Sequence, residues 1–241
     1  MLQLRTEKIY CGDIPVHVVH PVREMGKAVL LYHGWSSRAE FQTTKAAVFA
    51  LHGFTVFIAD AMHHGEREAL SDYYVAEDYP VFWETILQNI EEYPKLLSLL
   101  KEKGYEKPVL TGHSMGGMSV LGIAAAYPDT MKSVISFNGS GDWLLTHLFM
   151  QARFGMDAGR DWPLYDRLKE KQPLSHVEEM KHIPIFMTNG DADISVDPRA
   201  QAHFYEALHT SGGNVTRMVY PRLGHFVTTT MLDDALKWLN E

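Results

Sequence analysis

The motif Gly112-His113-Ser114-Met115-Gly116 carries the strongest chemical signal in the chain. It directly follows the apolar run 108–110 and precedes a helical pattern. A serine on a tight strand-to-helix turn has strained backbone geometry and an exposed hydroxyl, and glycines on both sides avoid Cβ atoms that would collide with neighbouring backbone. A glycine-rich helix start with a capping serine is the alternative. The strand–turn–helix setting favours Ser114 as a nucleophile.

A serine hydroxyl is a poor nucleophile at neutral pH, so it needs a base within hydrogen-bond reach and a third group that orients this base. His225 follows the last predicted strand, and a loop rich in aspartate follows the strand before it. The carboxyl ends of parallel strands share one edge of a sheet. We therefore expect His225 and an aspartate of this loop to converge on Ser114.

Three aspartates in this loop, Asp191, Asp193 and Asp197, are candidates for the orienting acid. Asp197 precedes Pro198, a pattern typical of a helix N-cap. Asp191 lies so close to the end of the strand that its side chain is available to the turn itself. Local spacing leaves the choice between Asp191 and Asp193 open.

Two backbone amides are candidates for binding the oxyanion that forms when a nucleophile attacks a carbonyl group. One is the amide of Met115, which comes directly after the nucleophile at the start of a helix. The other is the amide of Trp35, in the loop that follows the first core strand. A plain strand-to-helix turn is the alternative for that loop.

The chain has 13 histidines, and we interpret most of those outside the triad as structural. His63 and His64 are adjacent in a loop, but no cluster of carboxylates or cysteines accompanies them in the sequence, so they make a poor metal site. We expect no metal and no cofactor.

Composition and charge are those of an ordinary water-soluble globular chain, with 46% hydrophobic and 22% charged residues in 241. The formal net charge of -8, without a basic cluster, argues against a nucleic-acid partner. No window has the length of a membrane span or a signal peptide. The single Cys11 forms no intramolecular disulfide, and these features together predict a cytoplasmic location.

The hydrophobic pattern alternates short apolar runs with longer helical stretches, which predicts an α/β fold with a mostly parallel sheet of about eight strands and helices on both faces. Core strands are expected at 28–32, 55–59, 108–111, 133–137, 183–188 and 215–220. An N-terminal hairpin is expected to add 2–10 and 16–20. Helices are expected at 81–103, between Ser114 and Pro128, at 198–208 and at 229–239.

The stretch between the fourth and fifth core strands is longer than a crossover requires. We interpret residues 141–180 as a helical cap inserted into a core formed by residues 1–140 and 181–241. Five apolar side chains of this cap are candidates for the substrate pocket: Trp143, Leu144, Leu148, Phe149 and Phe154. Packing of the same side chains onto the core is the alternative.

The order of these motifs resembles that of the α/β-hydrolase superfamily. His33-Gly34, the turn around Ser114, Gly190-x-x-Asp193 and Gly224-His225 extend over about 190 residues. In that superfamily the aspartate of the G-x-x-D loop orients the histidine, which favours Asp193 over Asp191. The segment Asp60 to Arg67 resembles that of small bacterial esterases in the dienelactone-hydrolase and prolyl-oligopeptidase branch. This likeness implies scaffold roles for Asp60 and Arg67.

These observations predict a serine hydrolase that cleaves carboxylic esters with small to medium acyl groups through an acyl-enzyme intermediate. Ser114, His225 and Asp193 would form the triad, and a small-molecule ester would be the substrate. A thioesterase, an amidase and a lactonase use the same chemistry. A catalytically silent hydrolase fold that binds a ligand belongs to a different class. A homodimer is compatible with such a fold, but the sequence does not establish it.

Overall fold

The computed structural model describes residues 4–154, 162 and 164–241, and its centre is one sheet of eight strands. The strands are β1 (Thr6–Cys11), β2 (Ile14–Val19), β3 (Lys27–Tyr32), β4 (Phe54–Ala59), β5 (Val109–His113), β6 (Ser133–Phe137), β7 (Ile185–Gly190) and β8 (Val215–Tyr220). Their spatial order is β1-β2-β4-β3-β5-β6-β7-β8. The β1–β2 and β2–β4 pairs are antiparallel, and all others are parallel.

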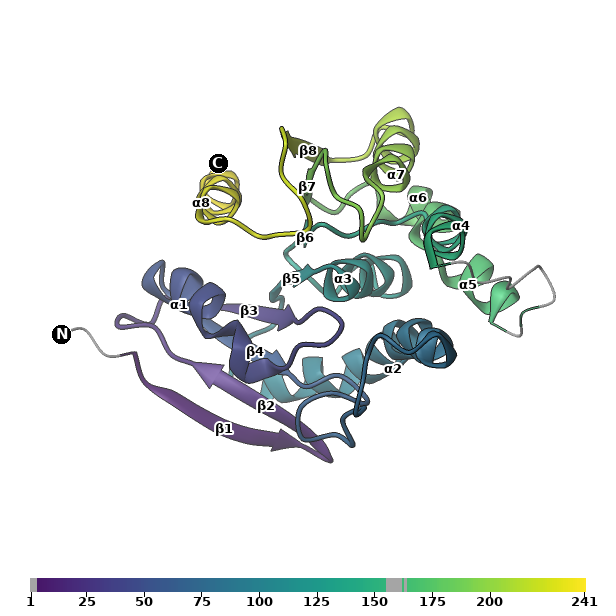
Figure 1. Ribbon diagram of the computed structural model, residues 1–241. Helices are drawn as coiled ribbons and strands as arrows, with labels where there is room; N and C mark the ends of the chain where they lie inside the picture. Colours follow the sequence, from purple (N-terminus) through teal and green to yellow (C-terminus); the bar gives the residue numbers. More distant parts are fainter. Residues whose placement is uncertain (1–3, 155–161, 163) are drawn as a thin grey trace.

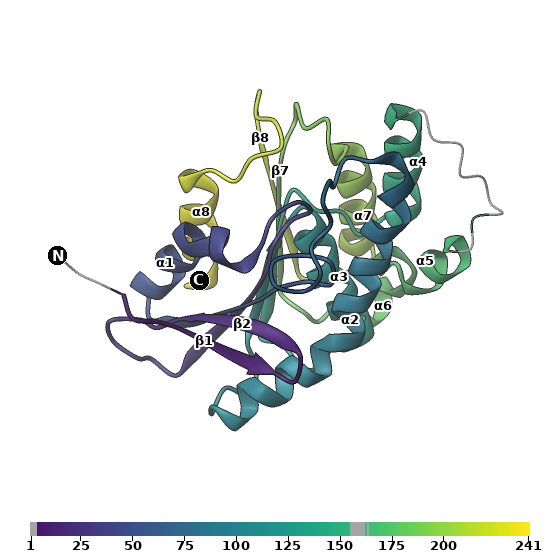
Figure 2. The same cartoon turned by 60° about the horizontal axis from the view of Figure 1, so that its bottom comes forward.

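Helices cover both faces of the sheet (Figures 1 and 2). One face carries α1 (Thr43–Leu51) and α8 (Thr229–Leu239). The other carries α2 (Tyr79–Glu102), α3 (Met115–Ala126), α4 (Trp143–Phe154), α5 (Tyr165–Lys171), α6 (Val177–Met180) and α7 (Pro198–Thr210). The described residues also form three short 3-10 helices: η1 (Ala39–Gln42), η2 (Ala76–Asp78) and η3 (Pro173–His176). Strands β3 to β7 are covered by helices on both faces of the sheet, and almost all of their residues are buried.

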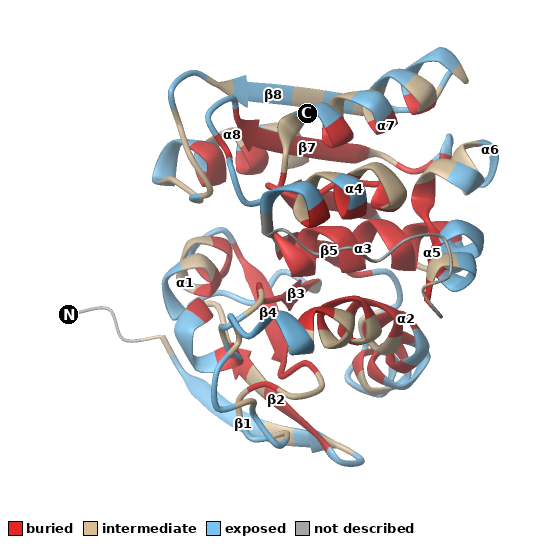
Figure 3. Ribbon diagram, turned by 45° about the vertical axis from the view of Figure 1, so that its right-hand side comes forward, coloured by how far each residue is buried: buried red, intermediate tan, exposed pale blue. Residues whose placement is uncertain are grey.

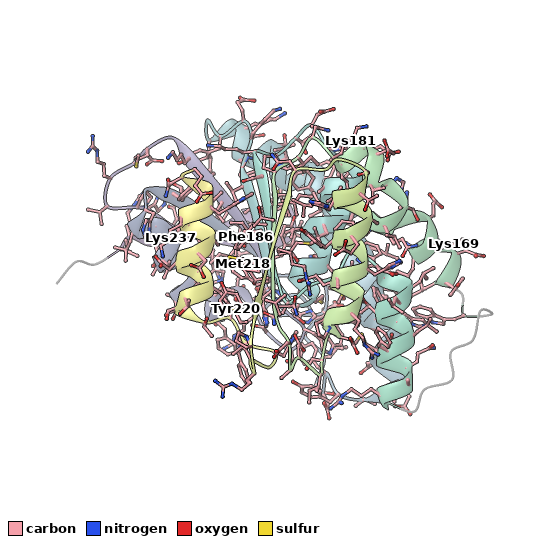
Figure 4. The ribbon with its side chains drawn as sticks, turned by 90° about the horizontal axis from the view of Figure 1, so that it is seen from above. Lys169, Lys181, Phe186, Met218, Tyr220 and Lys237 are labelled. Atoms are coloured by element: carbon pink, nitrogen blue, oxygen red, sulfur yellow. The ribbon has the colours of Figure 1, made fainter. Side chains whose placement is uncertain are left out.

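One apolar cluster of buried residues lies on each side of the sheet. Figure 3 shows that the buried residues concentrate in the central strands and in the helix faces that cover them. Helix α3 is buried along almost its whole length against β5 and β6. Strand β8 forms one edge of the sheet and is only partly buried. Seen from above, Phe186 and Tyr220 lie on the side of α8 (Figure 4), where Phe186 contacts Trp238 and the Tyr220 hydroxyl donates to Asp234.

The predicted fold class is confirmed, and the expected elements recur with their ends shifted by up to four residues. The largest shift is in the first strand, which was expected at 2–10 and begins at Thr6; residues 2 and 3 lie outside the described residues. Strand β7 begins at Ile185 rather than at residue 183, because Pro184 has no amide hydrogen for the sheet. The short helix α1 is absent from the sequence-based expectations. It has a weak amphipathic pattern, and its buried Ala46, Phe49 and Ala50 are explained by packing beside α8.

The stretch 141–180, predicted to be a cap, contains α4, α5, η3 and α6 on the same side of the sheet as α3 and α7. Leu168 and Met180 from this stretch are fully buried in the apolar layer that also contains α3. Its interpretation as a separate cap stays a prediction. None of the helices in the described part of the chain combines the length and the apolar content that a membrane span requires.

Candidate active site

Ser114 lies on the turn that joins β5 to α3, in a backbone conformation that non-glycine residues rarely adopt. Its φ is 58° and its ψ is -119°. A Cβ on Gly112 would collide with the backbone of Gly116, and a Cβ on Gly116 would collide with the carbonyl oxygens of Tyr32 and His33. The two glycines therefore allow the helix to start directly against β5 and β3. The turn has the strained geometry of a nucleophile elbow.

His225 and Asp193 meet at the same end of the sheet, where the segments that follow β7 and β8 lie together (Figure 2). His225 Nδ1 is 2.7 Å from Asp193 Oδ2. An ionised carboxylate only accepts hydrogen bonds, so the hydrogen lies on Nδ1 and the lone pair of the neutral ring lies on Nε2. This tautomer is the one that a general base requires.

Both oxygens of the Asp193 carboxylate are fully engaged. Oδ1 accepts from the amides of Ser195 and Val196 at 2.9 and 3.0 Å, and Oδ2 accepts from Asn138 Nδ2 at 3.1 Å as well as from His225. Burial acts to raise the pKa of Asp193. The hydrogen bond and the charge of His225 lower this pKa, and so do the hydrogen bonds from the Val196 amide and the Asn138 side chain. Together they outweigh burial, so the pKa of Asp193 lies below its ordinary value.

The two other aspartates of this loop have different partners. Asp197 accepts from the amide of Arg199 and caps α7, as its sequence pattern predicts. The Asp191 side chain accepts from the amide of Arg222, so it stabilises the turn after β8. Asp193 alone of the three aspartates contacts His225.

Ser114 and His225 line the same cavity. Among the described residues, no hydrogen bond joins the Ser114 hydroxyl to His225 Nε2. Hydrogen bonds between a nucleophile and its base are often long without substrate and shorten in the substrate complex, so this geometry is compatible with a catalytic pair. The structure brings the two side chains to one site without forming their bond.

The Met115 and Trp35 amides donate no hydrogen bond to another described residue, so both are free for an oxyanion. A Cβ on Gly34 would lie 3.5 Å from the Ser114 Cβ, which places the Trp35 loop beside the nucleophile. Trp35 Nε1 donates to the Tyr73 carbonyl oxygen at 2.7 Å, and this bond holds its ring. The geometry suits an oxyanion hole.

The cavity at Ser114 has a volume of about 350 Å³ and mainly apolar walls. Six of its thirteen lining residues come from the segment before and at the start of α2: Tyr73, Tyr74, Val75, Ala76, Tyr79 and Phe82. Trp35, Ser36, Met150, Ser195 and Val196 line the remainder, together with the catalytic candidates Ser114 and His225. The residues of this first group were not predicted from the sequence. Its signal was the aromatic pair Tyr73-Tyr74 in the long loop after β4, at the sheet edge that holds ligands.

The five predicted pocket residues of α4 do not line this cavity where their side chains are described. Trp143 is fully buried and packs against Trp83, whereas Leu144 packs against the core. Leu148 is exposed, and Phe149 lies under the guanidinium group of Arg199. The side chain of Phe154 lies outside the described residues.

The physical reason is helical periodicity. Residues 143, 147 and 150 share the inward face of α4, and this face brings Met150 to the cavity and buries Trp143 and His147. Leu148 and Phe149 point away from it. The four predicted residues whose side chains are described therefore do not line the cavity, because Trp143 and Leu144 pack into the core and Leu148 and Phe149 lie away from it.

Asp60 and Arg67 lie in structural contacts, as the resemblance implied. Asp60 accepts from the amides of Ala39 and Glu66, which ties together the loops after β3 and β4. Arg67 forms two hydrogen bonds with the carboxylate of Glu92 on α2, at 2.8 and 2.7 Å. These contacts position the loop that precedes the cavity wall.

Three further histidines near the site are uncharged at neutral pH: His33 and His64 are buried, and His113 is partly buried. Burial lowers the pKa of His33 and that of His64 to about 4, and it lowers the pKa of His113 to about 3. His33 Nε2 accepts from the amide of Ala61, and the His64 ring packs against Trp35. The structural interpretation of His33 is consistent with these contacts. His64 belongs to an aromatic cluster, and the described residues contain no group of three potential metal ligands.

These histidines predict that the folded chain loses stability as the pH falls from 6.5 toward 4. The unfolded chain binds protons on the three imidazoles below pH 6.5, whereas the folded chain does not until the pH approaches their lowered pKa values. Each such imidazole lowers the free energy of unfolding by about 1.4 kcal/mol per pH unit within this window. Urea denaturation between pH 7.5 and 5.0 measures this slope. Equal stability at both ends would contradict the prediction.

The sheet order, the turn at Ser114 and the His225–Asp193 pair define a member of the α/β-hydrolase superfamily. Residues 88–240 match the prolyl oligopeptidase family, and residues 23–150 match the serine aminopeptidase S33 family. The chain belongs to the prolyl oligopeptidase family. The resemblance stated from the sequence motifs is confirmed.

Known proteins with similarity over the whole chain include an esterase. Esterase YjfP of Escherichia coli is 26% identical over 253 residues, which cover 100% of this chain and 99% of that protein. The crystal structure of TT1662 from Thermus thermophilus has a TM-score of 0.76 at 24% identity and covers 99% of this chain and 98% of its own. A thermostable carboxyl esterase of Bacillus coagulans has a TM-score of 0.72 at 15% identity, with 100% and 99% covered. The two structures establish the shared fold.

Proposed function

We propose that this serine hydrolase cleaves uncharged carboxylic esters with small to medium apolar acyl groups. The observation that carries the proposal is the cavity at Ser114, which also contains His225 in the tautomer that its bond to Asp193 selects. The similarity to Esterase YjfP over the whole chain supports ester hydrolysis.

Acylation would begin when His225 Nε2 takes the proton of Ser114 and the serine oxygen attacks the ester carbonyl carbon. The carbonyl oxygen gains a negative charge, which the Met115 and Trp35 amides stabilise. Asp193 stabilises the imidazolium form of His225. The imidazolium then protonates the leaving alcohol as the bond between carbon and the alcohol oxygen breaks, which leaves an acyl group on Ser114.

Deacylation would repeat these steps with water. His225 Nε2 removes a proton from a water molecule, and the resulting hydroxide attacks the acyl carbon. The Ser114 oxygen leaves and recovers its proton from His225. The products are the free carboxylic acid and the alcohol, and the enzyme returns to its starting state without a cofactor.

The charge of the cavity favours an ester over a peptide with a free amino terminus. The described residues of the cavity wall include no Asp, Glu, Lys or Arg. An aminopeptidase has to bind the α-ammonium group of its substrate, and a buried ammonium group without a carboxylate partner is costly. Aromatic and aliphatic walls instead suit an uncharged acyl group.

Two substrate series test the proposal: p-nitrophenyl esters of increasing acyl length, and aminoacyl p-nitroanilides with a free amino group. We expect the kcat/KM of the butyrate ester to exceed that of the anilides by at least about 100-fold, because each anilide brings an unpaired charge into the apolar cavity. N-acetylated anilides control for the amide bond. Faster cleavage of the free aminoacyl anilides would refute the substrate class.

The same experiment separates the alternatives that share this chemistry. Thioester and lactone substrates of matched size, assayed beside the esters, report which leaving group the site prefers. A fluorophosphonate probe labels an activated serine without knowledge of the substrate. A chain that neither cleaves any ester nor reacts with the probe would be a silent hydrolase fold.

A further inference from the structure

Asn138 lies directly after β6, beside Asp193. Its backbone and its side chain both form hydrogen bonds. The residue is completely buried, and its φ of 52° falls in the left-handed region that asparagine tolerates better than most residues. Its amide donates to the carbonyl oxygen of Thr188 on β7 at 2.7 Å. The backbone of Asn138 is therefore tied to the strand that leads to Asp193.

The side chain of Asn138 meets the same carboxylate oxygen that binds His225. Nδ2 donates to Asp193 Oδ2 at 3.1 Å, and His225 Nδ1 donates to it at 2.7 Å. The opposite orientation of the Asn138 amide would place its oxygen against a carboxylate oxygen, so the donor orientation is required. In this orientation the Asn138 Oδ1 atom is buried without a partner in the described part of the chain.

A buried carbonyl oxygen without a partner is uncommon in folded proteins and calls for an explanation. No contact among the described residues requires an amide oxygen at that place. The amide hydrogen, in contrast, has a partner whose charge matters for the proposed reaction.

We propose that Asn138 is a positioning residue that holds the Asp193 carboxylate ionised and oriented toward His225. This inference rests on the proposed function. The amides of Ser195 and Val196 hold Oδ1, and Asn138 provides the second fixed donor on Oδ2, so the carboxylate cannot rotate away from the imidazole. Asn138 does not contact the reacting atoms and acts through Asp193.

The hydrogen bond from Asn138 affects how readily the Asp193–His225 pair binds a further proton. A donor that stabilises the negative charge on Asp193 lowers the affinity of the Asp193–His225 pair for a further proton. Removal of the Asn138 amide should raise this affinity, so the acid limb of the pH–rate profile should move to higher pH. The titratable groups around the pair are His113, whose ring lies 4.8 Å from that of His225, and the more distant Lys45 and Asp197. The variants leave all three in place.

The test uses Asn138→Gly and Asn138→Ala, which both lack the amide. Glycine suits the positive φ, and alanine leaves less empty space. In both variants we expect kcat for p-nitrophenyl butyrate to fall about tenfold, the effect of losing one hydrogen bond to a charged group, with little change in KM. The acid limb of kcat/KM should move up by roughly half a pH unit or more. Unchanged kcat, or reduced kcat with the acid limb in its original place, would overturn the proposal.

Thr188→Val is the matched control. Thr188 is fully buried beside Asn138, and its hydroxyl has no partner in the described chain, so the variant removes a neighbouring polar group and leaves Asp193 untouched. We expect its acid limb to coincide with that of the unmodified enzyme. An equal shift in Thr188→Val would mean that any disturbance of this region has the effect, and it would refute a specific role of Asn138.

An NMR measurement on the unmodified chain tests the proposal without requiring that a variant folds or that the enzyme turns over an ester. In NMR spectra, the Asn138 side-chain amide protons should shift with the same pH midpoint as the imidazole signals of His225, because both groups share Asp193 Oδ2. Amide signals that stay constant through this midpoint would overturn the inference. Failure of the proposed function would appear separately, as absence of ester turnover in the unmodified enzyme.

Discussion

Ser114→Ala is expected to lower kcat for p-nitrophenyl butyrate on the order of 10⁴- to 10⁶-fold, the loss typical of removing the nucleophile of a triad. The hydroxyl of Ser114 forms no hydrogen bond with another described residue, so its loss should leave the fold intact. Labelling by a fluorophosphonate probe should disappear together with turnover. A thermal unfolding curve of the variant verifies that the protein is folded.

Ser195→Ala provides the comparison for this first variant. Ser195 lines the same cavity, but its contribution to the Asp193 carboxylate comes from the backbone amide, which alanine retains. We expect a change of less than about tenfold, since only a cavity contact is altered. If Ser114→Ala retained turnover comparable to that of Ser195→Ala, Ser114 would not be the nucleophile.

Asp193→Asn is expected to lower kcat by about 10⁴-fold, as the loss of the orienting acid does in a serine triad. The Ser195 and Val196 amides require an oxygen on one side of the new side chain, so its NH2 group has to face His225. That NH2 group would donate to His225 Nδ1, which moves the imidazole hydrogen to Nε2. Nε2 could then no longer accept the proton of Ser114. Steady-state kinetics with p-nitrophenyl butyrate at neutral pH measures the effect.

Asp191→Asn is the control that separates the two acids left open by local sequence. Asp191 accepts from the Arg222 amide, a bond that the oxygen of asparagine also accepts, and His225 is bound to Asp193 instead. We expect kcat within about threefold of the unmodified enzyme for this variant. A larger loss in Asp191→Asn than in Asp193→Asn would assign the orienting role to Asp191.

The expected elements and motifs were correct where the determining interactions are local. Gly112 and Gly116 identify the turn at Ser114 because the close approach of a helix and a strand excludes Cβ atoms within a few residues. Asp197 identifies the start of α7 because its side chain caps an amide two residues away. The choice of Asp193 over Asp191 required the likeness to known hydrolases, since both aspartates follow the same strand.

The cavity wall was predicted poorly because it depends on contacts between distant segments. Apolar content identified α4 as a candidate, but tertiary packing determines which face of that helix is inward. The Tyr73-Tyr74 segment becomes part of the wall through bonds to residues about forty positions earlier: the Tyr73 carbonyl to Trp35 and the Tyr74 hydroxyl to Ser36. No periodic pattern encodes such a contact.

The sequence by itself determined the α/β fold class, the elbow at Ser114 and the chemical types of the residues around it, because strand periodicity and backbone sterics act over short stretches of chain. Only the tertiary structure decided which aspartate contacts His225, that Asn138 shares its carboxylate, and which side chains enclose the cavity. Hydrogen bonds and burial depend on distances in space, and residues such as 138, 193 and 225 approach one another only when the sheet aligns the ends of its strands.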